Sequence, residues 1–309
     1  MVSSVGVAST ARVSSRTWMH RRSSIFALLL LAAPTFARNM LYDAGEWSSL
    51  WWLPTQTTAG GAAQPGTQLM GDVGIPHLIF LPSGTPPKGG FPLIVFLHGQ
   101  GESSPSPLPN VALQGPPQSA GRHPSTTPFA VLSPQKPMMS QFFDEEVASG
   151  IATAIRHYLG QQPLDPRRVY LTGISQGGIG TWGLASDAKY NELFAAIAPV
   201  CGGFPNRPNK RADVLKSTPV WAFHGENDSI LPVSMSDESV AALRKSARTA
   251  EVKYDRIPEA RGTDPSWAAA GVPDMEGHAS WVHAYYPPGT RVGENPPLYD
   301  WLLKHHRPA

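Results

Sequence analysis

Short apolar runs bounded by Gly and Pro alternate along this chain with longer windows that have helical spacing. The apolar runs, together with the mixed run Val252–Ile257, predict strands at His77–Leu81, Leu93–Leu97, Phe129–Leu132, Val169–Thr172, Phe194–Val200, Val220–Phe223 and Val252–Ile257. The helical windows are Asp144–Leu159, Gln176–Ser186, Asp237–Ala247 and Pro297–His305. Because apolar strands that alternate with helices are typical of sheets covered on both faces, the pattern predicts an α/β fold with a parallel sheet.

Two stretches fit no predicted element, Ser103–Pro128 and Arg261–Gly277. Both are longer than ordinary connections, and loops of that length usually carry function or are disordered. Their positions beside the candidate site described below favour function.

The first 37 residues have the composition of a targeting segment. They contain no Asp or Glu, and the basic pair Arg21-Arg22 precedes the apolar run Ile25–Ala33 and the small-x-small signal Thr35–Ala37. The run is far shorter than the roughly 20 residues that span a bilayer, so we expect no integral membrane span in the mature protein. We expect an exported or organellar protein, directed to a plastid and its thylakoid lumen or secreted, with a twin-arginine route permitted.

The rest of the chain is predicted to form an irregular N-terminal extension over 38–68, whose tryptophans pack onto the domain, and one catalytic domain over 69–309. The net charge of +2 falls to −2 when the four arginines of the leader are removed, so no nucleic-acid partner is expected. A single cysteine, Cys201, excludes an intramolecular disulfide and a cysteine-only metal cluster.

The strongest candidate for chemistry is Ser175, in Gly173-Ile174-Ser175-Gln176-Gly177, between a predicted strand and a predicted helix. A serine raised on a tight strand-to-helix turn needs small residues two positions before and after it. The five-residue string alone is weak, but its strand–turn–helix context predicts a nucleophile.

A serine nucleophile needs a base, and the base needs an orienting carboxylate; in this topology the acid and then the histidine follow the serine. The loop after Val220–Phe223 offers Asp228, with Glu226 as its rival, while His224 at the strand end is predicted to pack or hydrogen-bond there. The base is predicted to be His278. Its competitors later in the chain are His283, His305 and His306.

A tetrahedral intermediate needs preorganised N–H donors. The amide of Gln176 follows the nucleophile, and the loop His98–Glu102 offers the amide of Gln100, with Gly99 leaving the backbone room to approach substrate. Trp281, close to the predicted base, is a candidate substrate contact. Phosphate-cradling glycine patterns and spaced metal ligands are absent from the sequence, so neither a metal nor another cofactor is expected.

These motifs together resemble the α/β-hydrolase esterases of the "predicted peptidase" and phospholipase/carboxylesterase group, relatives of polyhydroxybutyrate depolymerases and feruloyl esterases. The resemblance runs over about residues 75 to 305 and rests on the motifs 97–102, 165–178, 180–182, 198–203, 223–228 and 298–303. It implies an α/β-hydrolase fold, with a mostly parallel central sheet flanked by helices, and ester hydrolysis by Ser175, Asp228 and His278. It also supports the amides of Gln100 and Gln176 as oxyanion donors.

The resemblance leaves the substrate open among small-molecule, polysaccharide-linked and lipid-linked esters. Acyl thioester or lipid acyl hydrolysis is the alternative within enzymes, and a catalytically silent hydrolase fold used for binding is the alternative outside them. The segment Arg261–Gly277 departs from the pattern, because in such proteins the strand before it reaches the Gly-His within a residue or two. The insertion is expected to form a lid or a wall of the rim.

Overall fold

The structure, a computed structural model, describes residues 56–57, 66, 68–206, 208–260, 277–287 and 296–308. The predicted targeting segment 1–37, the tryptophans of the predicted extension and all of the insertion except Gly277 lie outside these residues. None of the helices in the described ranges combines the length and the hydropathy that crossing a bilayer requires.

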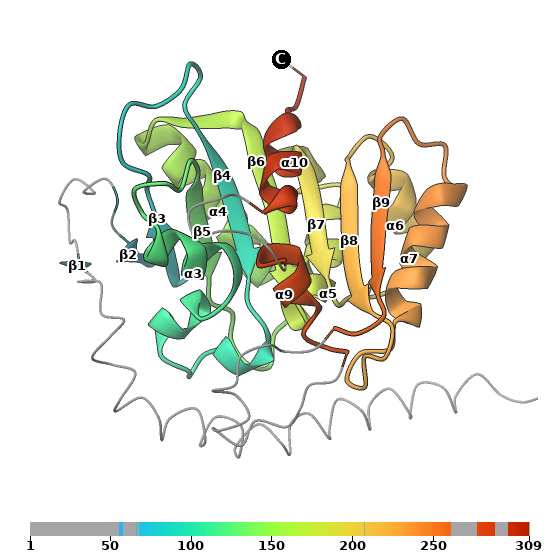
Figure 1. The fold of residues 1–309 in the computed structure, drawn as a ribbon. Coiled ribbons are helices and arrows are strands. Elements are labelled where there is room, and N and C mark those ends of the chain that lie inside the picture. Colours follow the sequence, from blue (N-terminus) through green and yellow to red (C-terminus); the bar gives the residue numbers. More distant parts are fainter. Residues whose placement is uncertain are drawn as a thin grey trace, which may run out of the picture.

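A nine-stranded sheet runs through the molecule in the order β1-β2-β3-β5-β4-β6-β7-β8-β9 (Figure 1). The strands are β1 (Gln56–Thr57), β2 (Gln68–Gly71), β3 (His77–Phe80), β4 (Phe91–Leu97), β5 (Ala130–Pro134), β6 (Leu164–Ile174), β7 (Ala196–Val200), β8 (Val220–Gly225) and β9 (Val252–Ile257). All pairs from β5 to β9 are parallel, whereas β3 pairs antiparallel with both β2 and β5. The mostly parallel sheet is therefore confirmed.

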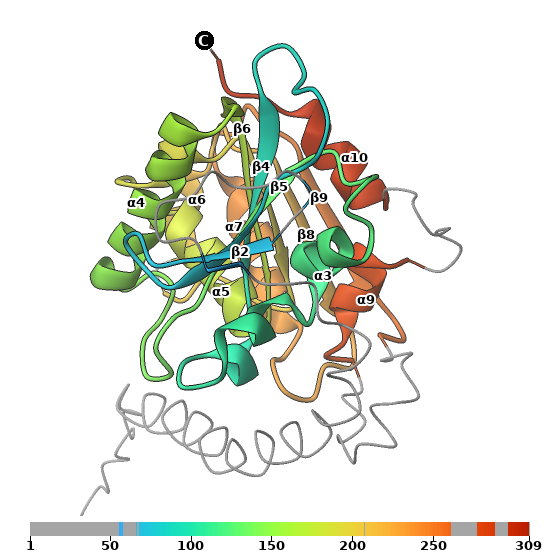
Figure 2. The same cartoon turned by 90° about the vertical axis from the view of Figure 1, so that its left-hand side faces the viewer.

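Helices cover both faces of the sheet (Figures 1 and 2). The α-helices are α3 (Gly115–Arg122), α4 (Glu145–Gln161), α5 (Gln176–Ala185), α6 (Pro208–Val214), α7 (Ser234–Lys245), α9 (Ser280–Tyr285) and α10 (Pro297–Lys304), and the 3-10 helices are η1 (Gln100–Glu102), η2 (Leu108–Ala112) and η3 (Asn191–Leu193). Apolar residues of α4, α5, α6 and α7 share one core cluster, and those of α3, α9 and α10 share the other.

The central strand β4 is apolar throughout because both of its faces are covered. Leu93, Val95 and Leu97 belong to one core cluster, while Ile94 and Phe96 belong to the cluster on the opposite face. Because successive side chains point to opposite faces, a strand covered on both sides needs an apolar residue at every position.

Each predicted strand is present, but the predictions missed several elements. The strand β1 lies in the segment 38–68 predicted to be irregular, β2 begins at the last residue of that segment, and neither β2 nor α6 was predicted. The prediction that Ser103–Pro128 holds no element was wrong, since η2 and α3 lie within it. Its prolines hid these helices: Pro116 stands in the first turn of α3, where a missing N–H costs nothing.

Candidate active site

The chain turns sharply at Ser175, between the end of β6 and the start of α5. Ser175 has φ 54° and ψ −116°, a conformation that a residue with a side chain rarely adopts. Its N–H donates to the carbonyl of Val200, 3.1 Å away, and lies 3.1 Å from Sγ of buried Cys201. These contacts with the end of β7 stabilise a strained turn that lifts the hydroxyl above the sheet.

The glycines beside Ser175 are required by close backbone contacts. A Cβ on Gly177 would lie 1.9 Å from the carbonyl oxygen of Leu97, and one on Gly173 would lie 2.7 Å from the same atom. A Cβ on Gly178 would lie 2.0 Å from the carbonyl oxygen of Val200. The turn is therefore wedged between β4 and β7, which explains the small residues in the motif.

Three side chains that are far apart in the sequence meet at this turn. Nε2 of His278 lies 3.0 Å from Oγ of Ser175, and Nδ1 of His278 lies 2.8 Å from Oδ2 of Asp228. The strands β6 and β8 run parallel, so the loops after their carboxyl ends carry Ser175 and Asp228 to one edge of the sheet. His278 joins them from the turn before α9.

Asp228 is buried but strongly hydrogen-bonded. Its Oδ1 accepts the N–H groups of Ile230 (2.9 Å) and Leu231 (2.8 Å). Its Oδ2 is 3.2 Å from Nε2 of His224, in addition to its contact with His278. Burial alone would raise the pKa of Asp228, but the hydrogen bonds from His224 and His278 outweigh it and hold this pKa well below its ordinary range. The carboxylate is therefore ionised at neutral pH.

The rival residues lie elsewhere. Glu226 is exposed, with its carboxylate 3.5 Å from Arg256. Nε2 of His305 is 3.2 Å from the carboxylate of Glu251, and His306 is exposed. His283 lies within α9, on the helix that follows His278.

The loop after β4 packs against the serine turn, as the oxyanion prediction requires. A Cβ on Gly99 would be 3.8 Å from Cγ1 of Ile174, so the backbone of this loop passes directly beside the end of β6. Gln100 begins η1 and Gln176 begins α5. Among the residues that the structure describes, neither main-chain N–H has a main-chain hydrogen-bond acceptor. Both amides therefore remain candidate oxyanion donors, as predicted.

A buried polar cluster behind this loop escaped the sequence analysis. It consists of His98, Glu102 and Lys136, which are 1%, 9% and 0% exposed. Nδ1 of His98 lies 2.6 Å from the carbonyl of Gly99 and 3.9 Å from Oε2 of Glu102. Buried charged residues are rare, and Lys136 follows β5, more than thirty residues from the motif, so no local pattern pointed to the cluster.

Trp281 is buried and packs edge-on against the imidazole of His278, with ring centroids 5.5 Å apart. Its described contact is with the candidate base, and a contact with substrate stays a prediction. His224 hydrogen-bonds at the end of β8, as predicted: its Nδ1 lies 2.7 Å from Oγ of Ser236, and its Nε2 lies 3.2 Å from the carboxylate of Asp228.

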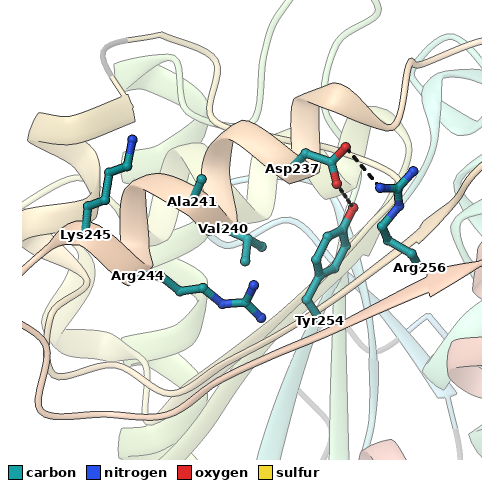
Figure 3. A pocket seen from close by; sticks show the side chains of 7 residues that line it. All are labelled: Asp237, Val240, Ala241, Arg244, Lys245, Tyr254 and Arg256. Carbon is teal, nitrogen blue, oxygen red and sulfur yellow. Dashed lines mark hydrogen bonds and ion pairs between the residues drawn. The ribbon is translucent and has the colours of Figure 1, made fainter.

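A hollow of about 450 Å³ lies away from these residues, between α7 and β9 (Figure 3). Tyr254 donates a hydrogen bond to Asp237, and Arg256 lies 3.7 Å from the same carboxylate. None of the predicted site residues lines this hollow. In the described ranges no group of three or more His, Cys, Asp or Glu side chains is arranged so that it could hold a metal ion.

Comparison with known proteins supports the fold. The sequence model of the phospholipase/carboxylesterase family matches residues 122–264. A thermostable esterase is 26% identical with a TM-score of 0.56, and the match covers 78% of this chain and 63% of the esterase. The chain is an α/β hydrolase by fold. The chain spans less than two thirds of the length of the thermostable esterase.

Two further α/β-hydrolase structures are more distant. The feruloyl esterase module from Clostridium thermocellum is 13% identical with a TM-score of 0.46, over 66% of this chain and 88% of the module. The acetyl xylan esterase from Aspergillus awamori is 18% identical with a TM-score of 0.43, over 58% of this chain and 79% of that enzyme. None of the curated proteins compared with the sequence matches it.

Proposed function

We propose that this protein is a serine hydrolase that cleaves carboxylic esters through an acyl-enzyme intermediate. The observation that carries the proposal is the chain of two hydrogen bonds from Oγ of Ser175 to His278 (3.0 Å) and from His278 to Asp228 (2.8 Å). A hydroxyl paired with an imidazole that is itself oriented by a carboxylate is the arrangement that activates serine. The family match and the similarity to the thermostable esterase support ester substrates.

The reaction would begin with transfer of the hydroxyl proton of Ser175 to Nε2 of His278 as Oγ attacks the ester carbonyl. The carbonyl π electrons move to its oxygen, where the amides of Gln100 and Gln176 stabilise the negative charge. Collapse of the tetrahedral species breaks the carbon–oxygen bond to the alcohol, which takes the proton from His278. Water then attacks the acyl-serine in the same way, giving the carboxylic acid and the free serine.

Asp228 has two tasks in this scheme. As an ionised acceptor it holds the proton of His278 on Nδ1, which leaves Nε2 free to accept the proton of Ser175. It also stabilises the imidazolium that forms during the reaction. The low pKa of Asp228 suits both tasks, because the carboxylate has to stay charged while the histidine gains a proton.

A lipid acyl hydrolase is the second candidate, because the matching family also includes phospholipases. The mechanism would be unchanged, and only the acyl and alcohol groups would differ. A substrate panel separates the two: we expect hydrolysis of short p-nitrophenyl, acetylated-sugar and feruloyl esters to exceed that of long-chain lysophospholipids and acyl thioesters. The reverse order of kcat/KM would favour the second candidate.

The test of the proposal is labelling by a fluorophosphonate probe, which reacts with activated serines. We expect the wild type to gain one adduct by mass spectrometry, mapped to Ser175, and Ser175→Ala to gain none and to lose ester hydrolysis. Ser149→Ala, which alters an exposed serine of α4, is the matched control and should label like the wild type. A folded wild-type protein that neither labels nor hydrolyses any ester would reject the proposal and favour a catalytically silent binding module.

A further inference from the structure

We propose that Lys136 is a positioning residue for the oxyanion loop, and that its buried ammonium group places a positive charge beside Gln100, whose amide is one of the two predicted oxyanion donors. The inference rests on the proposed function, because it concerns the rate at which the same site forms its tetrahedral intermediate. Four observations about the cluster of His98, Glu102 and Lys136 carry it, and we take them in turn.

The first observation is the environment of the ammonium group. Lys136 has no exposed surface, and its Nζ lies within hydrogen-bond distance of three oxygen atoms: Oγ of Ser103 (3.0 Å), Oε1 of Gln100 (3.2 Å) and the carbonyl of Pro137 (3.3 Å). Nζ also lies 5.7 Å from the centre of the ring of Phe142. An ammonium group has three donors, so three acceptors and an aromatic face suit the charged form of the side chain.

The second observation is that the side chain of Gln100 is held at both ends. Its Oε1 accepts from Lys136, and its Nε2 donates to the carbonyl of Met138, 3.1 Å away. Both contacts are to the segment that follows β5 and are independent of η1 itself. They hold the side chain of Gln100, and with it the start of η1, in one position before any substrate arrives.

The third observation concerns the carboxyl group on the same loop. Oε2 of Glu102 would be 3.1 Å from a Cβ on Gly99, so the group lies directly under the turn of the oxyanion loop. In the described part of the chain this oxygen has no hydrogen-bond partner. None of the ion pairs among the described residues includes Lys136, so its charge is not cancelled by a carboxylate within 4 Å, and part of its field reaches the substrate side.

The fourth observation is that both groups titrate near neutrality. Burial raises the pKa of Glu102 to about 7, and burial lowers the pKa of Lys136 to about 8. The charged groups that face Lys136 are the carboxylates of Glu102 and Asp144, which favour its charged form; His98 also lies beside it. Because the pKa of Lys136 lies above neutrality, its ammonium group is mainly charged at pH 7.

The physical consequence is selective for the transition state. A neutral ester gains little from a nearby positive charge, whereas the oxyanion of the tetrahedral species gains much in a site shielded from water. Replacing Lys136 removes both the positive charge and the hydrogen bond that holds the side chain of Gln100. The substitution should therefore lower kcat and leave KM almost unchanged.

The experiment compares Lys136→Met, Lys136→Arg and Gln100→Met with wild type on one p-nitrophenyl ester. We expect Lys136→Met to lower kcat about 100-fold, near the loss for one oxyanion donor, with KM within about threefold. Lys136→Arg should recover at least a tenth of the wild-type kcat. Lys189→Met, which alters an exposed lysine, is the matched control and should keep wild-type kcat.

Two further measurements test the route through Gln100 and the charge. The double variant Lys136→Met/Gln100→Met should lose little more than the worse single variant, because both substitutions break the same contact between Nζ of Lys136 and Oε1 of Gln100. The wild-type kcat should decline as pH rises through about 8, while Lys136→Arg should keep its kcat to higher pH. If Lys136→Met does not fold, as judged by circular dichroism, Gln100→Met tests the same contact from its other end.

The outcomes separate the two proposals. If the wild type hydrolyses esters but Lys136→Met and Gln100→Met both keep wild-type kcat, the inference about Lys136 is wrong and the proposed function stands. The same conclusion follows if KM rises while kcat is unchanged. If the wild type has no hydrolase activity and no labelled serine, both proposals are overturned together.

Discussion

Two carboxyl groups lie buried at the same edge of the sheet, yet the protein treats them in opposite ways. Asp228 is 8% exposed and Glu102 is 9% exposed. The pKa of Asp228 lies well below its ordinary range, whereas burial raises the pKa of Glu102 to about 7. Burial is therefore not what distinguishes them.

The difference lies in the hydrogen bonds that each group receives. The oxygens of Asp228 meet two main-chain amides and two histidines, whereas the carboxyl group of Glu102 receives main-chain hydrogen bonds from Gly99 and Glu102, and its Oε2 has no partner within the described ranges. Donors replace the lost water around a carboxylate, and where they are too few to offset burial the carboxyl group is more stable when neutral. The comparison suggests that Asp228 is built to stay charged and Glu102 to gain and lose a proton near pH 7.

The largest expected effect comes from removing the charge of Asp228. Asp228→Asn should fold normally but lower kcat about 10⁴-fold, because the amide can donate to Nδ1 of His278 and favour the tautomer that cannot accept the proton of Ser175. Steady-state ester hydrolysis measures it. Glu226→Gln, an exposed carboxylate in the same loop, is the control and should stay within about twofold of wild type.

A smaller effect should follow from removing one donor to Asp228. His224→Leu takes away the contact with Oδ2 and the partner of the Ser236 hydroxyl, 2.7 Å from Nδ1 of His224. We expect kcat to fall about 10-fold and the free energy of unfolding to fall by about 1–3 kcal/mol, because polar groups are left buried without partners. Urea unfolding and ester kinetics on the same preparation check this. Unchanged values of both would mean that His278 and the two amides suffice to hold the carboxylate.

Glu102 should make the stability of the wild-type protein depend on pH. The pKa of Glu102 is about 7 in the folded protein and ordinarily 4.5, so between these values the folded protein holds a proton that the unfolded chain has released. Stability should therefore fall as pH rises through this window, by on the order of 3 kcal/mol for this group alone.

Glu102→Gln removes that titration. The variant should gain stability relative to wild type as pH rises from about 5 to 8 and should match it at about pH 4. Urea unfolding at several pH values measures the trend. A constant difference between the two proteins across this range would show that Glu102 is not protonated on folding.

The sequence alone identified the chemical parts of the candidate site but not their setting. Ser175 could be predicted because its glycine spacing and strand–turn–helix context are local features. Asp228 and His278 could be predicted from the order in which the loops leave a parallel sheet. Lys136 gave no signal, because its contacts with Gln100 and Ser103 join residues more than thirty positions apart. The sequence also did not show that His224 contacts the carboxylate of Asp228.

What the sequence determined by itself was the arrangement of elements: apolar strands, intervening helices and a serine on a glycine-flanked turn. These features depend on backbone sterics and on the periodicity of burial, which act between near neighbours. Only the tertiary structure decided which buried groups carry charge. Ionisation depends on every donor and dipole that packing brings within a few ångströms, and that environment is assembled from distant parts of the chain.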